Sequence, residues 1–405
     1  MTARYYQGGD GIDTVDFSKS PEGVVVSLAT NSIGSGGYAA GATFDSIENL
    51  IGTGYSDQLT GNTASNILQG GAGNDTFYGS TGTGDTFYGG TSSVSNSNDK
   101  DTANYGSFDS SHALTVDMSS KINNYYTVNV NGGQQDKLYD IVNLQGSKGD
   151  DTITGDSADN HIWGNEGDDI LKGGLGNDTL EGGLGNNKLF GGDGADNLLG
   201  GDGNDTLIGG AGADVLDGVG GMNTASYEDS NAGVKASLAN TGTNTGDARG
   251  DTYSRIQNLL GSDFADTLEG DANANTLSGG GGNDVLLSSA GADSFSGGAG
   301  NDTVDYSSIN SALTIAVNTG NNSVAATGDA LGDVIGQDIE TIQGASADTI
   351  FLAGNRTYIT TYAGIFGKTN TVSYANVQGT GVQADLRNTS GVASSFNTGA
   401  ALNDR

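Results

Sequence analysis

The chain has 405 residues, and its 49 acidic against 15 basic residues give a formal net charge of −34. This charge repels nucleic acids and anionic membrane surfaces, so the composition argues against both as partners and favours cations. Glycine contributes 71 residues, hydrophobic residues make up only 34%, and cysteine is absent. Because this composition is close to that of a disordered chain, folding requires a ligand that offsets the charge. No stretch approaches the roughly 18 apolar residues of a membrane span, so no transmembrane segment is expected.

A nine-residue repeat organises the sequence into runs. The longest run begins at Gly146 with GSKGDDTIT and continues without a slip, through GGLGNDTLE and GGDGNDTLI, to Asp217. Other runs begin at Gly52 and Gly261. In chain order, the predicted segments are residues 1–51 with a lone copy, GGDGIDTVD, and a linking block, 52–90 with the first run, 91–145 with a linking block, 146–218 with the run of eight repeats, 219–260 with a linking block, 261–305 with the third run, and 306–405 with further linking blocks.

The eighth position of the repeat predicts one buried strand face. In the long run this position is always a large aliphatic residue: Ile153, Ile162, Leu171, Leu180, Leu189, Leu198, Leu207 and Leu216. Positions seven and nine are mostly polar, as Thr179 and Glu181 are, which indicates a three-residue strand after each glycine-rich loop. Two repeats would close one coil, and coils would stack their strands in parallel at about 4.8 Å. The predicted fold is all-β, an elongated parallel β-roll or β-solenoid with 18-residue coils, interrupted by linking blocks with longer strands.

The sixth position points to the ligand. Glycines at positions one, two and four allow backbone conformations in which successive carbonyl groups turn toward a common centre. A carboxylate or amide at position six adds a hard oxygen, and about six to eight hard oxygens without nitrogen or sulfur describe a Ca²⁺ site. The predicted side-chain ligands are Asp57, Asn66, Asp75, Asp85, Asp151, Asn160, Asp169, Asp178, Asn187, Asp196, Asp205, Asp214, Asp266, Asn275, Asp284, Asp293 and Asp302. The predicted carbonyl ligands in the long run are those of Gly173, Leu175, Asn177, Gly191, Asp193 and Ala195.

Coil geometry predicts where the ions lie. Repeats n and n+2 share one edge of the roll, so each ion should lie between two sixth-position residues one coil apart. This predicts about eleven sites, between Asp57 and Asp75, Asn66 and Asp85, Asp151 and Asp169, Asn160 and Asp178, Asp169 and Asn187, Asp178 and Asp196, Asn187 and Asp205, Asp196 and Asp214, Asp266 and Asp284, Asn275 and Asp293, and Asp284 and Asp302. Filled with divalent ions, they would change the charge from −34 to about −12. Asn187 would face two ions and lower the affinity of each site.

These repeats resemble the haemolysin-type, or RTX, nonapeptide GGxGxDxUx, a Ca²⁺-binding β-roll repeat. The resemblance is carried by copies in register such as GGAGNDTFY at residues 70–78 and GGAGNDTVD at residues 297–305. Three copies, GDSADNHIW, GDANANTLS and SSAGADSFS, depart from the pattern. The resemblance implies a secreted or cell-surface bacterial protein, exported unfolded by type I secretion from a Ca²⁺-poor cytosol and folded outside.

A second recurrence fills the segments between the runs. The blocks open with sequences such as DTANYGSFDSSHALTVDM and close with sequences such as YSRIQNLLGSDFADTL. Alternation at Val24, Val26 and Leu28 predicts longer strands that continue the stack with wider coils. The pattern is similar to the linking blocks of large secreted RTX proteins. The last block stops before its closing sequence, so the chain is expected to be a fragment, and residues 346–368 lose the period.

No catalytic arrangement accompanies the repeats, and we expect no enzyme activity. His112 and His161 are far apart in sequence, and neither HExxH nor GxSxG occurs. Acid pairs such as Asp168 and Asp169 lie in the periodic loops, which favours loop and ligand roles over catalysis. Outward aromatic residues could stack on sugars, although packing on the strand face is favoured; these are Trp163, Phe190, Tyr78 and Tyr88.

These observations favour a calcium-binding, calcium-folded structural segment that serves as spacer or scaffold of an adhesin, surface-layer or matrix protein. The alternative is the RTX carrier portion of a secreted enzyme, or a polysaccharide-binding module. The predicted partners are calcium ions, with cell-surface glycans or other matrix proteins as further candidates.

Overall fold

The computed structural model describes residues 4–82, 84–90, 99–121, 124–131, 133–316, 323–325, 327, 330–352, 361–363 and 370–373. The chain divides into two compact units, residues 1–206 with 219–221 and residues 207–218 with 222–405. The described residues form short strands and three short 3₁₀ helices, and none of them forms an α-helix. In this part of the chain no helix has the length and apolar character needed to cross a membrane. The predicted all-β class is confirmed.

The strands of the first unit are three to seven residues long. They are β1 (Tyr5–Gln7), β2 (Thr14–Asp16), β3 (Val25–Ser27), β4 (Thr43–Asp45), β5 (Asn49–Ile51), β6 (Gln58–Thr60), β7 (Ile67–Gln69), β8 (Thr76–Tyr78), β9 (Thr86–Tyr88), β10 (Thr102–Asn104), β11 (Leu114–Asp117), β12 (Tyr126–Val130), β13 (Gln134–Tyr139), β14 (Asn143–Gln145), β15 (Thr152–Thr154), β16 (His161–Glu166), β17 (Ile170–Leu175), β18 (Thr179–Leu184), β19 (Lys188–Gly194) and β20 (Asn197–Asp202), with the 3₁₀ helix η1 (Gly37–Ala39). Where the chain passes from one unit to the other, the strands are β21 (Thr206–Gly212) and β22 (Val215–Val219).

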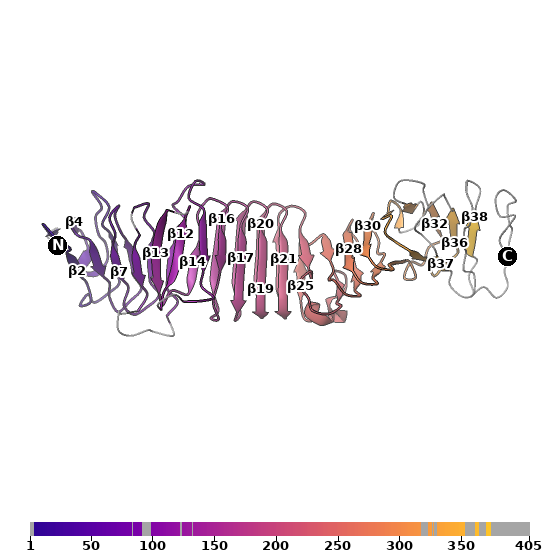
Figure 1. Cartoon of the computed structure of the whole chain (residues 1–405), viewed down its shortest axis with the longest axis horizontal. Helices are drawn as coiled ribbons and strands as arrows, with labels where there is room; N and C mark the ends of the chain where they lie inside the picture. The colour runs from indigo at the N-terminus through magenta and orange to yellow at the C-terminus, as the bar shows by residue number, and fades with distance from the viewer. Residues whose placement is uncertain are drawn as a thin grey trace. The chain divides into compact units, whose positions relative to one another are not determined.

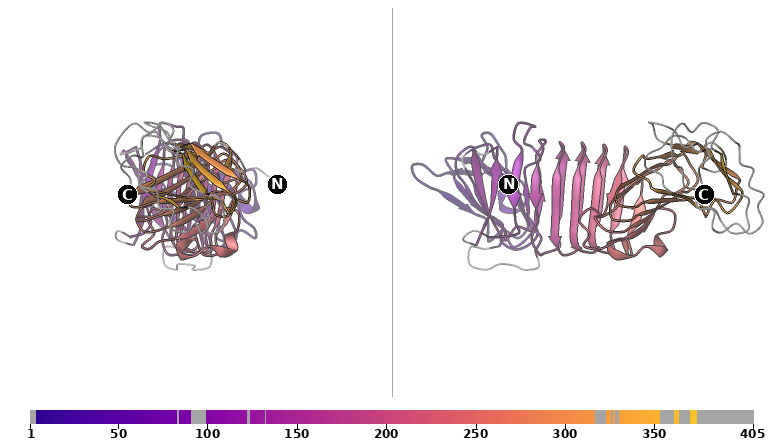
Figure 2. Two further views of the ribbon diagram at one scale, coloured as in Figure 1. Left: turned by 90° about the vertical axis from the view of Figure 1, so that its right-hand side faces the viewer. Right: turned by 45° about the vertical axis from the view of Figure 1, so that its right-hand side comes forward.

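Two parallel sheets alternate along the first unit. One has the strand order β3, β6, β8, β10, β14, β16, β18, β20. The other contains the series β2, β5, β7, β9, β13 and the series β11, β15, β17, β19. Consecutive repeats therefore enter opposite sheets, and two repeats close a coil. Within the first unit, the strands of the long run, β15 to β20, stack side by side in Figure 1 and stand as parallel arrows in the right view of Figure 2.

The strand register gives the coil length. Leu180 on β18 pairs with Leu198 on β20, and Leu171 on β17 pairs with Leu189 on β19, so each coil takes 18 residues. All eight aliphatic residues at position eight of the long run are at most 1% exposed. The parallel β-roll and the inward register are thus confirmed.

From β16 onward the strands of the long run are longer than predicted, whereas β15 has the three residues expected. β16, β17, β18 and β20 have six residues and β19 has seven, because they continue through the glycines to position three and beyond. Gly174, for example, pairs with Gly192 inside the sheet and has a φ of +116°, a conformation that other residues disfavour. In the first run, β6 to β9 have the three residues expected.

The second unit repeats the architecture. Its strands are β23 (Thr224–Ser226), β24 (Lys235–Ser237), β25 (Thr252–Ser254), β26 (Asn258–Leu260), β27 (Thr267–Glu269), β28 (Thr276–Gly281), β29 (Val285–Leu287), β30 (Ser294–Ala299), β31 (Thr303–Asp305), β32 (Leu313–Ala316), β33 (Ser323–Ala325), β34 (Val334–Ile335), β35 (Thr341–Gln343), β36 (Thr349–Leu352), β37 (Thr361–Ala363) and β38 (Asn370–Ser373), with the 3₁₀ helices η2 (Thr241–Thr243) and η3 (Gly246–Ala248). One parallel sheet has the order β24, β27, β29, β31, β35, β37, and the other contains β23, β26, β28, β30, β34. Leu268 pairs with Leu286, which again gives an 18-residue coil.

Linking blocks continue the stack with wider coils, as predicted. Val26 on β3 pairs with Leu59 on β6, and Val116 on β11 pairs with Ile153 on β15, so these coils take 33 and 37 residues. Longer strands occur in the second block, where β12 and β13 form an antiparallel pair of five and six residues, and in the last blocks, where β32 and β36 have four residues each. In the first block β3 has three residues, although Val24, Val26 and Leu28 are buried as predicted. Within residues 346–368, the described parts contribute β36 and β37.

Candidate metal centres

All seventeen predicted side-chain ligands lie in the interior of the roll. Their exposed fractions range from 0% to 4%, although Asp and Asn are usually surface residues. They project from the turn before each strand, while position eight of the following strand fills the core. The interior of each unit therefore has apolar layers and polar rows side by side.

A hydrogen-bond ladder connects the sixth positions along each edge. The N–H of Asp178 donates to the Oδ1 of Asp196 at 2.7 Å, and the N–H of Asn187 donates to the Oδ1 of Asp205 at 2.8 Å. The same bond joins ten of the eleven predicted pairs. The eleventh pair, Asp196 and Asp214, has its members in different units. The sequence predicted this stacking but not the ladder, which occupies one oxygen of each accepting side chain.

The second carboxylate oxygen has no hydrogen-bond partner in one group of aspartates. The Oδ2 atoms concerned are buried and belong to Asp75, Asp169, Asp178, Asp284 and Asp302. Desolvation raises the pKa of Asp75 and Asp169 to about 8 and that of Asp178 to about 7. These oxygens are therefore costly to bury as anions, and a bound cation would relieve that cost.

The first glycine of the repeat shapes a small oxygen-lined cradle. A Cβ atom at Gly164 would collide with the Oδ2 of Asp169 and lie 2.6 Å from the carbonyl oxygen of Gly182. A Cβ at Gly279 would likewise meet the Oδ2 of Asp284 and the carbonyl oxygen of Gly297. The missing side chain thus lets a carboxylate oxygen approach a carbonyl oxygen from the next coil.

The donor set of these turns fits Ca²⁺. Within the described residues, no group of three or more His, Cys, Asp or Glu side chains is arranged to hold a metal ion. The turns of aspartates such as Asp169 and Asp284 instead offer one carboxylate oxygen together with backbone carbonyls, which are the hard oxygen ligands that Ca²⁺ accepts. Among the predicted carbonyl ligands, that of Asp193 also accepts the N–H of Gly176 at 3.0 Å. As metal ligands, the carbonyls of Gly173, Leu175, Asn177, Gly191, Asp193 and Ala195 all stay predictions.

At the start of each run, a hydroxyl residue at position two satisfies the carboxylate. The N–H of Ser147 donates to the Oδ2 of Asp151 at 2.6 Å, and its hydroxyl donates to the Oδ1 at 2.8 Å. The equivalent pairs are Thr53 with Asp57 and Ser262 with Asp266. Hydroxyls at position two also reach Asp85 from Ser80 and Asp293 from Ser289, both at 2.9 Å.

The second repeat of each run carries an asparagine whose amide oxygen and amide nitrogen both form hydrogen bonds with the protein. The Oδ1 of Asn160 accepts the N–H of Asp156 at 2.9 Å, and its Nδ2 donates to the carbonyl of Val142 at 2.7 Å. Asn66 makes the same bonds with Asn62 and Glu48, and Asn275 makes them with Asp271 and Gln257. The carbonyl acceptor comes from the closing sequence of the preceding linking block in each case.

Asn187 differs from these three. Its Oδ1 accepts the N–H of Asp169 at 3.0 Å, so the ladder fixes the orientation of the amide. Its Nδ2 then lies 3.4 Å from the carbonyl oxygens of Gly185 and Gly200. A Cβ at Gly182 would collide with this Nδ2, just as one at Gly173 would collide with the Oδ2 of Asp178. The NH₂ group of Asn187 therefore occupies the place of an aspartate Oδ2.

Sequence analysis missed the carboxylates of the linking blocks that continue the ladder. The N–H of Asp85 donates to Asp136 at 2.7 Å, and that of Asp214 donates to Asp251 at 3.0 Å. Buried tyrosine hydroxyls donate to the other oxygen of these carboxylates at 2.8 Å, from Tyr105 to Asp136 and from Tyr227 to Asp251. The order Asp-Thr-Tyr at residues 251–253 matches positions six to eight and could have indicated this role. Asp101 and Asp333 are further members of the ladder.

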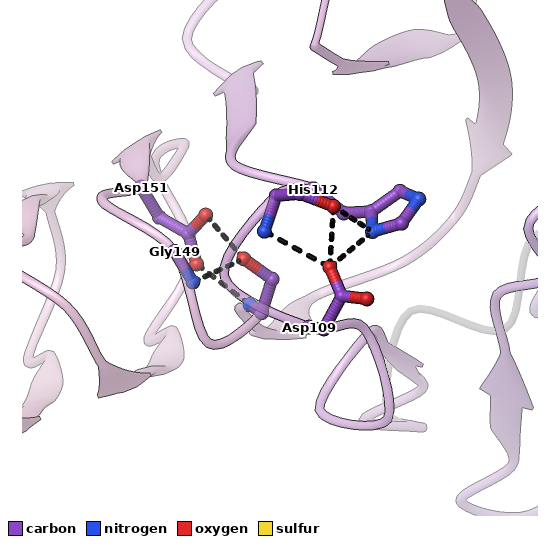
Figure 3. Close-up of polar contacts among 6 residues, drawn as sticks. Asp109, His112, Gly149 and Asp151 are labelled. Carbon is purple, nitrogen blue, oxygen red and sulfur yellow. Dashed lines mark hydrogen bonds and ion pairs between the residues drawn. The ribbon is translucent and has the colours of Figure 1, made fainter.

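The histidines stand apart from these rows. His112 lies 2.7 Å from Asp109, with side chains 33% and 70% exposed, and Figure 3 shows this pair on a loop beside Asp151. His161 lies 2.7 Å from Glu181 and stacks on Trp163. Both pairs have the exposed, two-member form of ordinary surface interactions.

The stacked coils, glycine cradles and buried carboxylates define a parallel β-roll of the calcium-binding class. The family model of the RTX calcium-binding nonapeptide repeat matches residues 51–85, 143–171, 154–189, 163–198, 190–224, 260–295 and 279–308. This chain therefore carries RTX calcium-binding nonapeptide repeats, and these form a calcium-binding structural region. No curated protein matches the chain.

Proposed function

We propose that this chain is a calcium-folded structural segment of a secreted or cell-surface bacterial RTX protein, in which it serves as spacer or scaffold of an adhesin, surface-layer or matrix protein. The observation that carries the proposal is the row of buried carboxylate oxygens without a hydrogen-bond partner, such as those of Asp169 and Asp178. Ca²⁺ binds the folded coil, so its free concentration sets the stability by mass action.

Charge supports an extracellular site of folding. The formal net charge of −34 opposes compaction until cations neutralise part of it. A chain of this kind stays unfolded where Ca²⁺ is scarce and folds where Ca²⁺ is abundant. This behaviour suits a protein that crosses a secretion channel unfolded and then acts outside the cell as a spacer or scaffold. The proposal assigns the chain no catalytic role.

Calcium binding by wild type and two variants tests this function. Equilibrium dialysis followed by metal analysis should find several Ca²⁺ ions on each folded chain, and Asp178→Asn should lower that number because it removes a buried carboxylate oxygen. Asp168→Asn is the matched control, since Asp168 is an exposed aspartate at position five of the preceding repeat. A wild-type chain that binds no Ca²⁺, or equal losses in both variants, would reject the proposal.

A polysaccharide-binding module is the second candidate, and one group of aromatic residues favours it. Tyr88 on β9 and Tyr139 on β13 stack with ring centroids 4.4 Å apart on the outer sheet face. Tyr125 lies 5.3 Å from Tyr139, and the ammonium of Lys137 is 5.4 Å from the Tyr125 ring centre. Aromatic faces beside a cation can bind acidic sugars. Glycan-array binding that Tyr139→Ala abolishes would support this candidate.

A further inference from the structure

The sixth-position sites divide into two kinds although they are equally buried. Asp151 and Asp169 are both 1% exposed, and they are joined by the same ladder. The protein satisfies both oxygens of Asp151, whereas the Oδ2 of Asp169 has no partner. Burial and residue type therefore do not explain the difference.

In the first kind, position two folds back onto position six of its own repeat. The N–H of Ser147, Asn62 or Asp271 donates to the side chain four residues later at 2.6 to 2.8 Å. Serine or threonine adds its hydroxyl as a second donor. We call these closed repeats. Their sixth-position residues are Asp57, Asn66, Asp85, Asp151, Asn160, Asp266, Asn275 and Asp293.

In the second kind, position two has a positive φ and turns its N–H away. Gly71 has a φ of +116° and donates to the carbonyl of Gly89, and Gly298 has a φ of +96° and donates to Asp338. Asn165, the one other residue type at this position, also has a positive φ, of +84°. These positions precede Asp75, Asp302 and Asp169, whose Oδ2 atoms have no partner. We call these open repeats.

We propose that position two decides which repeats take a Ca²⁺ ion, so that ions occupy the open repeats and the closed repeats hold their turns with protein hydrogen bonds alone. This inference rests on the calcium-binding function proposed above. The open repeats are those of Asp75, Asp169, Asp178, Asp284 and Asp302, together with Asp196, Asp205 and Asp214, which follow Gly192, Gly201 and Gly210 with φ of +113°, +115° and +93°.

Asn187 is the one asparagine at position six of an open repeat. Its repeat is open, because Gly183 at position two has a φ of +103°. The amide nevertheless places an NH₂ donor where the other open repeats have a carboxylate oxygen, and the donor faces carbonyl groups. The amide therefore replaces the ion, and this turn is a gap inside the ion row of the long run.

Each run consequently begins with two closed repeats. The long run then continues with open repeats, whereas the first and third runs also contain later closed repeats, those of Asp85 and Asp293. Closed repeats supply coils whose polar groups are satisfied before any ion arrives, as those of Asp57 and Asn66 are. Ions then stabilise the coils that follow. The pattern gives the roll a metal-independent start at the end of each linking block.

The same substitution at two asparagines tests the proposal. Asn187→Asp restores a carboxylate in an open repeat, so bound Ca²⁺ should rise by about one ion per chain in saturating Ca²⁺. Asn160→Asp is the matched control in a closed repeat. There the new carboxylate meets the carbonyl of Val142 in place of an amide donor, so bound Ca²⁺ should not rise and the urea midpoint should fall. The count is read by metal analysis after equilibrium dialysis, and circular dichroism monitors folding.

Ser147→Gly provides an independent test, because it should also increase the number of bound Ca²⁺ ions. It converts GSKGDD into GGKGDD, removes the hydroxyl that closes Asp151 and allows a positive φ, so it should also add about one ion. This variant decides the question if Asn187→Asp does not fold. A folded Asn187→Asp or Ser147→Gly chain without added Ca²⁺ would overturn the proposal, as would an equal gain in Asn160→Asp. A wild-type chain that binds Ca²⁺ while the three variants match it would overturn this inference and leave the calcium-binding function standing.

Discussion

Asn160 and Asn187 occupy the same position of the repeat and use their amides differently. Asn160 donates to a carbonyl of the preceding linking block and accepts an N–H from its own turn. Asn187 accepts the ladder N–H and directs its NH₂ group toward the turn carbonyls. The sequence predicted both as neutral metal ligands, because it shows the spacing but not which coil provides the partner. Val142, the acceptor for Asn160, lies 18 residues earlier in a block without the nine-residue period.

Removal of one buried tyrosine hydroxyl should destabilise the first unit. In Tyr105→Phe, the Oδ2 of Asp136 loses a 2.8 Å bond inside the roll, which should lower the free energy of unfolding by about 1–3 kcal/mol. Urea denaturation in saturating Ca²⁺ measures this change. Tyr78→Phe is the control, since its hydroxyl makes only an exposed 3.5 Å contact with Gln58. Equal midpoints for the two variants would mean that the hydroxyl of Tyr105 contributes nothing.

At the scale of the element, the strand and the turn before it have different determinants. Strands depend on position eight, whose aliphatic residues are buried throughout the long run, and periodicity alone predicts them. In the long run, strand length follows position two, because a positive φ at Gly174 lets β17 continue to Leu175, whereas β15 ends before Asp156. Alternation of apolar and polar residues carries no information on φ, so the longer strands could not be predicted from it.

The turns should also make the metal-free chain sensitive to pH. Desolvation raises the pKa of Asp75 and Asp169 to about 8 in the folded chain, against about 3.9 in an unfolded one. Protonation therefore favours folding: this contribution is complete below about pH 3.9 and is lost as the pH rises toward 8. In metal-free buffer, circular dichroism should show more β-structure at pH 5 than at pH 9. More β-structure at pH 9 would contradict the burial of these carboxyls.

At the scale of the whole molecule, the coil length and the inward face were predictable because eighteen residues and one aliphatic position recur without a slip in the long run. Linking blocks were predictable as wider coils, but their ladder carboxylates, such as Asp136 and Asp251, were not. Asp136 lies on β13, which pairs with β12 in an antiparallel hairpin. It accepts the ladder N–H of Asp85, although the two residues are 51 positions apart in the sequence. The nine-residue period predicts the coils that repeat it. It cannot predict where a residue of a long linking block lies, because that block has no period.

The dependence of folding on Ca²⁺ is the central claim, and far-ultraviolet circular dichroism with and without the ion tests it most directly. At pH 7.5, a chelator should leave the chain largely disordered, and millimolar Ca²⁺ should produce the β-sheet spectrum. Sodium chloride at matched ionic strength is the control, because it screens the charge of −34 without filling the turns. A chain that is equally folded in chelator, or that sodium chloride folds as well as Ca²⁺ does, would contradict the account.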